Sequence, residues 1–177
     1  RGLGDVYKRQ AVDQVGGPQV RNIGTIGGNV CNGAVSADSA PTLFSLNAML
    51  RIADGTGGRM VPIRDFYLGP GKVDLHQGDV LTHIVIPGKD YQGYHGFYIK
   101  YSMRNAMDIA TLSCSVVSRI DPLKKVLEDV RITFGVAAPV PYRCMKAEEA
   151  LRGMKIGEEL YQKAVSYTHL TLPTILR

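Results

Sequence analysis

The feature that most constrains this sequence is a cluster of glycines close to its N-terminal end. Six of them fall within one short stretch, at positions 16, 17, 24, 27, 28 and 33. Glycine has no Cβ, so it permits tight turns and a close approach of the backbone to a ligand. The cluster therefore predicts a loop whose backbone N–H groups are open to a bound group.

The segment Gln19–Asp38 (QVRNIGTIGGNVCNGAVSAD) adds polar side chains to these glycines. A Gly-rich loop can bind a pyrophosphate through backbone N–H groups without cationic side chains. Thr25 and Asn29 supply a hydroxyl and an amide, and Asp38 supplies a carboxylate suited to hydroxyls or a ring N–H. The spacing matches neither GxGxxG in a βαβ unit nor GxxxxGK[ST], which excludes the Rossmann and P-loop interpretations. From these residues alone, a purely structural loop remains the alternative.

Length and composition place the chain among folded domains. It has 177 residues, of which 45% are hydrophobic and 21% charged, which is enough for a buried core and excludes a disordered tail. No apolar run reaches the roughly 18 residues that a membrane span requires. The three cysteines, at 31, 114 and 144, are an odd number without CxxC spacing. They indicate neither a secreted disulfide scaffold nor a metal site, and we expect them to pack as small apolar side chains.

The two ends differ from the rest of the chain. Residues 1–10 (RGLGDVYKRQ) and 165–177 (VSYTHLTLPTILR) show no helix or strand periodicity. Asp5–Gln10 can be encoded by a DNA string whose reverse complement, in another frame, encodes Val165–His169. Both ends therefore resemble translated adapters of a transposase-based sequencing library. We expect them to be non-native and exclude them from fold reasoning, and we expect residues 11–164 to be a gene fragment.

Removing these ends changes the charge balance. Lys plus Arg falls from 21 to 17 and Asp plus Glu from 16 to 15, so the net charge falls from +5 to +2. Nucleic-acid binding needs a basic patch or stripe, and none remains in residues 11–164. We therefore expect no nucleic-acid partner.

Residues 11–88 read as the first structural part. A helix is predicted from Ser36 or Asp38 to about Asn47, with Pro41 in its first turn. The turn at 54–58 (DGTGG) predicts a hairpin of strands 48–52 and 59–62. One helical turn at 63–68, a Gly-Pro-Gly loop at 69–71 and a strand at 80–86 follow.

Residues 89–164 read as a second part, which opens in the polar connector GKDYQGYHG that follows Pro87. Strands are predicted at 97–102, 110–120 and 126–134, followed by helices at 144–154 and 157–164. Val130, Ile132 and Phe134 alternate with polar residues along the last strand, which is typical of a sheet with one buried face. Strands followed by helices indicate an α+β layer arrangement with an antiparallel sheet.

These segments resemble a known family. The motif VRNIGTIGGNVCNG followed by SAD is similar to the second flavin-binding motif of the molybdenum hydroxylase flavoproteins. The similarity continues through PTLFSLNAMLRI, the GPGK loop, KYSMRNAMDIATLSCSV and ITFGVAAPVPYRC, in the family's order. The Cys-Asn-Gly and Ser-Ala-Asp variants look most like the FAD subunit of bacterial xanthine dehydrogenases.

The resemblance implies a fold and a role. The fold is the second half of a two-subdomain FAD-binding domain of the vanillyl-alcohol-oxidase type, over residues 11–88, followed by an incomplete C-terminal flavoprotein subdomain over residues 89–164. The role is electron transfer from molybdopterin through 2Fe-2S clusters, on partner subunits, to FAD and then to NAD or another acceptor. A cytoplasmic location follows from the same resemblance, and no residue of this chain is expected to act as nucleophile, general base or metal ligand.

The family's flavin contacts map onto particular positions. The pyrophosphate loop corresponds to Thr25, Ile26, Gly27, Gly28 and Asn29. Asp38 corresponds to a flavin-contacting carboxylate, and Leu81 to a strand residue near the isoalloxazine. Lys100 corresponds to the family's flavin-contacting lysine. Asp108 lies in the family's Asp-Ile pair near the flavin and is a weaker correspondence.

Two departures from the family pattern bear on these expectations. The family's first Gly-rich FAD motif is missing, so we expect the chain alone to bind FAD poorly. Val35-Ser36-Ala37 stands where the family often has Ser-Pro, which puts the local backbone geometry in question. Two alternatives remain open: the FAD subunit of a carbon monoxide dehydrogenase or aryl-CoA reductase, and a non-catalytic interaction domain that has lost flavin.

Overall fold

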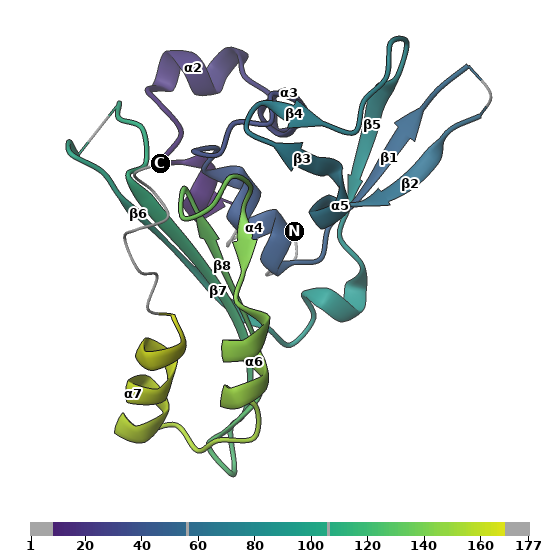
Figure 1. Cartoon of the computed structure of the whole chain (residues 1–177). Helices are drawn as coiled ribbons and strands as arrows, with labels where there is room; N and C mark the ends of the chain where they lie inside the picture. The colour runs from purple at the N-terminus through teal and green to yellow at the C-terminus, as the bar shows by residue number, and fades with distance from the viewer. Residues whose placement is uncertain (1–8, 56, 106, 169–177) are drawn as a thin grey trace.

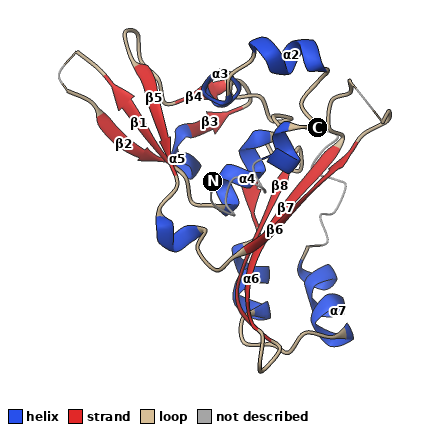
Figure 2. Ribbon diagram, turned by 180° about the vertical axis from the view of Figure 1, so that it is seen from behind, coloured by secondary structure: helices blue, strands red, loops and turns tan. Residues whose placement is uncertain are grey.

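The computed structural model describes residues 9–55, 57–105 and 107–168 (Figure 1). Most of the two adapter-like ends therefore lies outside the described residues. Mixed helices and antiparallel sheets confirm the predicted α+β class. Two sheets diverge from a short central helix, α4, and two helices close the lower end of the larger sheet (Figures 1 and 2).

The first sheet has the strand order β2-β1-β5 and is antiparallel throughout. Strand β1 is Met49–Ala53, β2 is Arg59–Pro62 and β5 is Val80–Val85. The pairing of β1 with β2 confirms the predicted hairpin. The hairpin turn needs Gly58, because its φ is +107° and a Cβ would lie 2.4 Å from the Ile52 carbonyl oxygen. A single helical turn, α5, and the short pair β3–β4 follow β2, at Ile63–Phe66, Tyr67–Gly69 and Lys72–Val73.

The glycine cluster contains helices where the sequence predicts a loop. Two short helices, α2 at Pro18–Ile23 and α3 at Ile26–Cys31, occupy much of the predicted loop. Pro18 starts α2, where its fixed φ and missing N–H are tolerated, and the Thr25 side chain caps α3 by accepting from the Gly28 N–H. Thr25 and Pro18 therefore override the low helix propensity of the glycines.

The second sheet has the order β6-β7-β8-β9, again antiparallel. A single 3₁₀ turn, η1 at Gly88–Asp90, connects the two sheets. The strands are His95–Tyr101, Leu112–Asp121, Val126–Gly135 and Tyr142–Arg143. Helices α6, Met145–Leu151, and α7, Glu158–Tyr167, pack on one face of it over a core that contains Val130, Ile132 and Leu160.

Both faces of β8 are buried, which the alternation along the strand does not show. Val130, Ile132 and Phe134 face α6 and α7, as predicted. The polar positions Arg131 and Thr133 are also buried, at 7% and 0% exposure, because the opposite face of the strand contacts α4.

Helix α4, Ser39–Ser45, joins the two parts of the fold. All seven of its residues are buried, and it contacts α3, α5, β7 and β8. The Ser45 hydroxyl donates to Thr133 Oγ1 at 2.8 Å, which satisfies a polar group that burial would otherwise penalise. Asp38 stands at the N-cap position as predicted, but its side chain makes no capping hydrogen bond to the helix.

A buried cation ties the connector between the sheets to β8. Arg131 pairs with Asp90 at 3.0 Å and with Asp129 at 3.4 Å, and it stacks over the Tyr94 ring at 4.5 Å. Tyr94 in turn donates to Asp129 at 2.7 Å. The arginine therefore neutralises one carboxylate of the connector and one of β8.

Helix α7 extends further than predicted. It continues past Ala164 to Tyr167, into the C-terminal segment that shows no helical pattern in the sequence, and residues 9–12 are also helical. Val165 and Tyr167 continue a helix already anchored by Leu160. Among the described residues, no helix is long and apolar enough to cross a membrane.

Replacement of Arg131 tests the connection between the two parts. Arg131→Ala leaves the buried Asp90 without its cation, whereas Asp129 keeps Arg152 at 2.9 Å, so we expect the free energy of unfolding to fall by about 3 kcal/mol. Urea denaturation followed by circular dichroism measures the change. Lys124→Ala removes an exposed pair with Asp121, in which the lysine is 79% exposed, and is expected to cost less than about 1 kcal/mol. Equal losses in the two variants would contradict the assignment.

Candidate functional site

The first turn of α3 presents the free backbone donors of the candidate site. Gly28 N–H donates to Thr25 Oγ1 at 2.9 Å, and Asn29 N–H donates to the Thr25 carbonyl at 3.0 Å. The first N–H groups of a helix have no intrahelical acceptor. Within the described part of the chain, the N–H groups of Ile26 and Gly27 make no hydrogen bond. These two donors are therefore available to an external acceptor.

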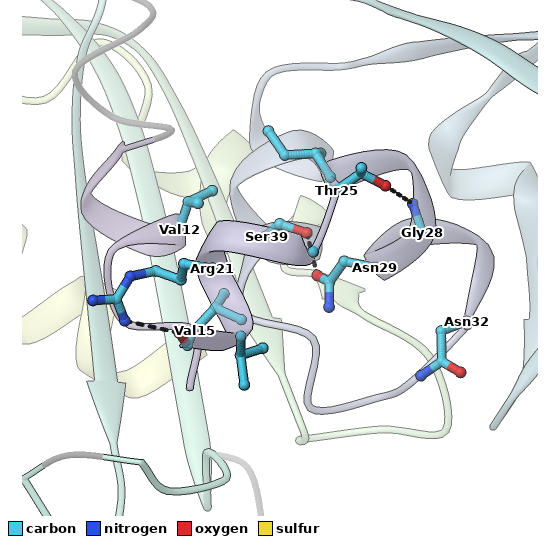
Figure 3. Close-up of a pocket in the computed structure, with 11 residues that line it drawn as sticks. Val12, Val15, Arg21, Thr25, Gly28, Asn29, Asn32 and Ser39 are labelled. Atoms are coloured by element: carbon cyan, nitrogen blue, oxygen red, sulfur yellow. Dashed lines mark hydrogen bonds between the residues drawn. The ribbon is translucent and has the colours of Figure 1, made fainter. Parts of the chain in front are cut away.

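A cavity of about 390 Å³ opens beside this turn (Figure 3). Thr25, Ile26, Gly28 and Asn29 line one side of it, and Arg21 lines another. The Arg21 guanidinium donates to the carbonyls of Val15 and Gly16, both at 3.0 Å, and Asn29 Oδ1 accepts from the Ser39 hydroxyl at 2.6 Å. The remaining walls are mainly apolar, with Val12, Val15 and Val20.

Two further cavities share α3 as a wall. One, of about 300 Å³, is lined by Ile26, Gly27 and Leu81 together with other residues of β5. A Cβ on Gly27 would lie 4.0 Å from the nearest Leu81 atom, so packing in this structure does not require glycine there. The other cavity, of about 240 Å³, is lined by Asn29, Asp38 and Asp108.

Asp38 and Lys100, distant in sequence, form a buried ion pair. Lys100 Nζ lies 2.8 Å from Asp38 Oδ2, and both side chains are 7% exposed. The ammonium also donates to the Gln14 carbonyl at 2.9 Å. The structure thus places these two predicted residues together.

Tyr98, which was not among the predicted site residues, completes this group. Its hydroxyl donates to Asp38 Oδ1 at 2.7 Å. Burial and the neighbouring Asp38 carboxylate raise the pKa of Tyr98, so the hydroxyl keeps its proton. The signal in the sequence is the i, i+2 spacing of Tyr98 and Lys100, which puts both on one face of β6.

Asp108 is engaged by its own loop. Its carboxylate accepts from the N–H groups of Arg104 at 2.8 Å and Ile109 at 3.0 Å. Burial alone would raise the pKa of Asp108, but these hydrogen bonds hold it below its usual value. Asp108 borders the third cavity without contacting the Asp38–Lys100 pair.

The nine positions named from the sequence therefore surround α3. Eight of them line the three cavities, and the ninth, Lys100, reaches the same region through its ion pair with Asp38. No group of three or more metal-ligating side chains occurs among the described residues.

Two known protein families match this sequence, one over each part of the chain. Residues 4–89 match the family described as the FAD binding domain in molybdopterin dehydrogenase. Residues 97–174 match the family described as the CO dehydrogenase flavoprotein C-terminal domain. The chain belongs to the FAD-binding flavoproteins of the molybdenum hydroxylases.

Individual sequence relatives belong to the same family of molybdenum hydroxylase flavoproteins. The xanthine dehydrogenase FAD-binding subunit of Escherichia coli O157:H7 is 43% identical over 83% of the chain and 50% of the relative. The glyceraldehyde dehydrogenase medium chain of Sulfolobus acidocaldarius is 32% identical over 88% of the chain and 54% of the relative. The chain spans about half the length of the relatives it matches.

Solved structures share the fold. A carbon monoxide dehydrogenase from Hydrogenophaga pseudoflava aligns with a TM-score of 0.80 and 30% identity, over 87% of this chain and 52% of that one. Quinoline 2-oxidoreductase from Pseudomonas putida 86 aligns with a TM-score of 0.77 and 26% identity, over 87% and 52%.

The residues around α3 fit part of an FAD site. The two free N–H groups of Ile26 and Gly27 suit an anionic pyrophosphate, and no side chain blocks them at Gly27. The apolar side of Leu81 suits a flat ring, and Asp38 and Lys100 offer an acceptor and a donor.

Removal of the Tyr98 hydroxyl tests the buried group. Tyr98→Phe deletes a hydrogen bond to a carboxylate, and we expect the free energy of unfolding at pH 7 to fall by about 1.5–3 kcal/mol. The pKa of Tyr98 is higher in the folded than in the unfolded chain. Its contribution to the free energy of unfolding is therefore complete below about pH 10, and it declines above that pH because the unfolded tyrosine ionises first. Denaturation at pH 7, 9 and 10.5 should therefore show a gap between wild type and variant that narrows with pH. A Tyr101→Phe variant, exposed on the same strand, is the control.

Proposed function

We propose that this chain supplies part of the FAD site in a xanthine dehydrogenase-type molybdenum hydroxylase. The complex would pass electrons from iron–sulfur clusters through FAD to NAD or another acceptor. The observation that carries the proposal is the gathering of the flavin-associated residues around α3, in a chain 43% identical to a xanthine dehydrogenase FAD-binding subunit.

The chain's own residues would bind and orient the cofactor. Ile26 and Gly27 would donate their N–H groups to the pyrophosphate, and Leu81 would pack beside the ring. Lys100 and Asp38, already held together at 2.8 Å, would contact the flavin as a fixed pair. FAD itself supplies the redox chemistry when bound, so the protein needs no nucleophile or general base here.

The proposal includes partners. A molybdopterin-binding subunit and a 2Fe-2S subunit would deliver the electrons, in a cytoplasmic complex. We also propose that residues 11–88 form the second FAD subdomain and residues 89–164 the C-terminal flavoprotein subdomain.

A carbon monoxide dehydrogenase or aryl-CoA reductase subunit is the second candidate. The alignment with the Hydrogenophaga pseudoflava enzyme, at a TM-score of 0.80, favours it. Turnover of the assembled complex separates the two: reduction of an acceptor with xanthine or hypoxanthine supports the purine enzyme. Turnover with another donor and neither purine supports the second candidate.

Flavin content tests the role of α3. The protein is expressed from the longest reading frame that contains residues 11–164, and released FAD is measured by its absorbance and fluorescence. We expect a yellow wild-type protein, and we expect Gly27→Val to weaken FAD binding about tenfold or more, because the branched side chain separates the pyrophosphate from the backbone donors.

Gly157→Val is the matched control, since that glycine has open space around it and lies outside the candidate site. Full flavin retention in Gly27→Val would refute the proposed contact. A colourless wild-type protein that does not take up added FAD would instead support the interaction domain that has lost flavin.

A further inference from the structure

The largest of the cavities described here lies at the other end of α4 from α3. Its volume is about 470 Å³, and it opens where α4, the starts of β1 and α5, η1 and the start of α6 meet. None of the residues assigned to flavin lines it. Ligand cavities commonly form at such junctions between structural units.

The floor of this junction cavity is apolar. Phe44, Met49 and Ile63 contribute to it, and Met145, which is 58% exposed, adds apolar surface to the same lining. Phe44 and Ile63 belong to the core and are only 5% and 2% exposed, so the floor is fixed by packing beneath it. It suits an aromatic or aliphatic body.

One wall is polar and already held in place. Asn47 donates to Asp90 Oδ1 at 2.7 Å and accepts from the Arg143 guanidinium at 2.7 Å. Asp90 is further paired with Arg131 at 3.0 Å, and Arg143 with Glu148 at 2.9 Å. The wall is therefore close to charge-neutral, and Asn47 keeps this geometry with a φ of +48°.

The rim carries cations that this network does not neutralise. Arg64 is 73% exposed, and its one ion pair among the described residues is a long one, at 3.7 Å, with Asp65, which is 58% exposed. Lys89 is exposed on η1 and forms no ion pair among the described residues. An apolar floor beneath two available cations is complementary to an apolar molecule that carries one negative group.

We propose that the junction cavity binds a small organic anion, with an aromatic or aliphatic body on the Phe44–Met49–Met145 lining and a carboxylate, sulfonate or phosphate between Arg64 and Lys89. This site is separate from the FAD site and does not depend on it. The interaction is non-covalent and involves no reaction.

Methionine methyl groups give a local test on the 177-residue chain. Two of the six methionines, Met49 and Met145, line the junction cavity. Met107 lines a cavity beside α3, while Met60 and Met154 lie outside both. Each ¹³C-labelled methyl signal is assigned by a Met→Leu substitution, and the chain is titrated with naphthalene-1-sulfonate.

We expect the Met49 and Met145 signals to shift together along one saturable curve, with Met60 and Met154 unchanged. The cationic analogue naphthalene-1-methylammonium should shift them little at the same concentration, because the rim repels it. Arg64→Gln with Lys89→Gln should weaken binding of the sulfonate about fivefold, as expected for two solvent-exposed charge contacts.

The double variant Lys72→Gln with Lys124→Gln is the control, because both residues are exposed cations and neither lines the cavity. Unchanged Met49 and Met145 signals would overturn the proposal, and so would shifts at Met107 alone. Equal binding of the two naphthalene probes would also overturn it, since the site would then recognise only apolar surface.

Discussion

The burial of α4 is the constraint on which the rest of the structure depends. An isolated helix of seven residues is unstable in water. Helix α4 is therefore stabilised by the sheets and the helix α3 that cover it. Its approach to β8 is close: a Cβ on Gly135 would lie 2.4 Å from the Ser113 hydroxyl oxygen and 2.9 Å from Pro41. Gly135 is therefore required by contact rather than by an unusual backbone conformation. The cavity beside the first turn of α3 and the junction cavity lie at opposite ends of this one helix.

Local patterns predicted most of the fold. The turn at 54–58 has the glycines that a hairpin needs, and Pro41 and Asp38 mark the start of α4. The helices within the glycine cluster could not be predicted from propensity, because Thr25 capping and packing decide them. Arg131 and Thr133 read as solvent-facing positions of β8, yet a helix distant in sequence covers them. Which face of a strand is covered is a tertiary property, and one strand's alternation does not contain it.

The candidate site followed mainly from resemblance and only partly from residue chemistry. Glycines, Thr25 and Asp38 pointed to anion and hydroxyl recognition without any family knowledge. The pairing of Asp38 with Lys100 crosses 62 positions, and no spacing rule connects residues so far apart. Tyr98 could not be predicted, because a single buried hydroxyl cannot be distinguished in sequence from a tyrosine that only packs. The buried pair costs desolvation, and Tyr98 offsets part of that cost by donating a second hydrogen bond to the carboxylate.

Strand β6 has a consequence for handling the protein. Its inward face holds Tyr98 and Lys100, whereas Phe97, Ile99 and Tyr101 on the outward face are 56–66% exposed. β6 is an edge strand of its sheet, and the Tyr98 backbone N–H, on the side away from β7, donates to the Gln10 side chain at 3.3 Å. An apolar edge of this kind is a template for intermolecular strand pairing. Concentrated solutions of the chain should therefore be limited by self-association along β6 before they are limited by unfolding.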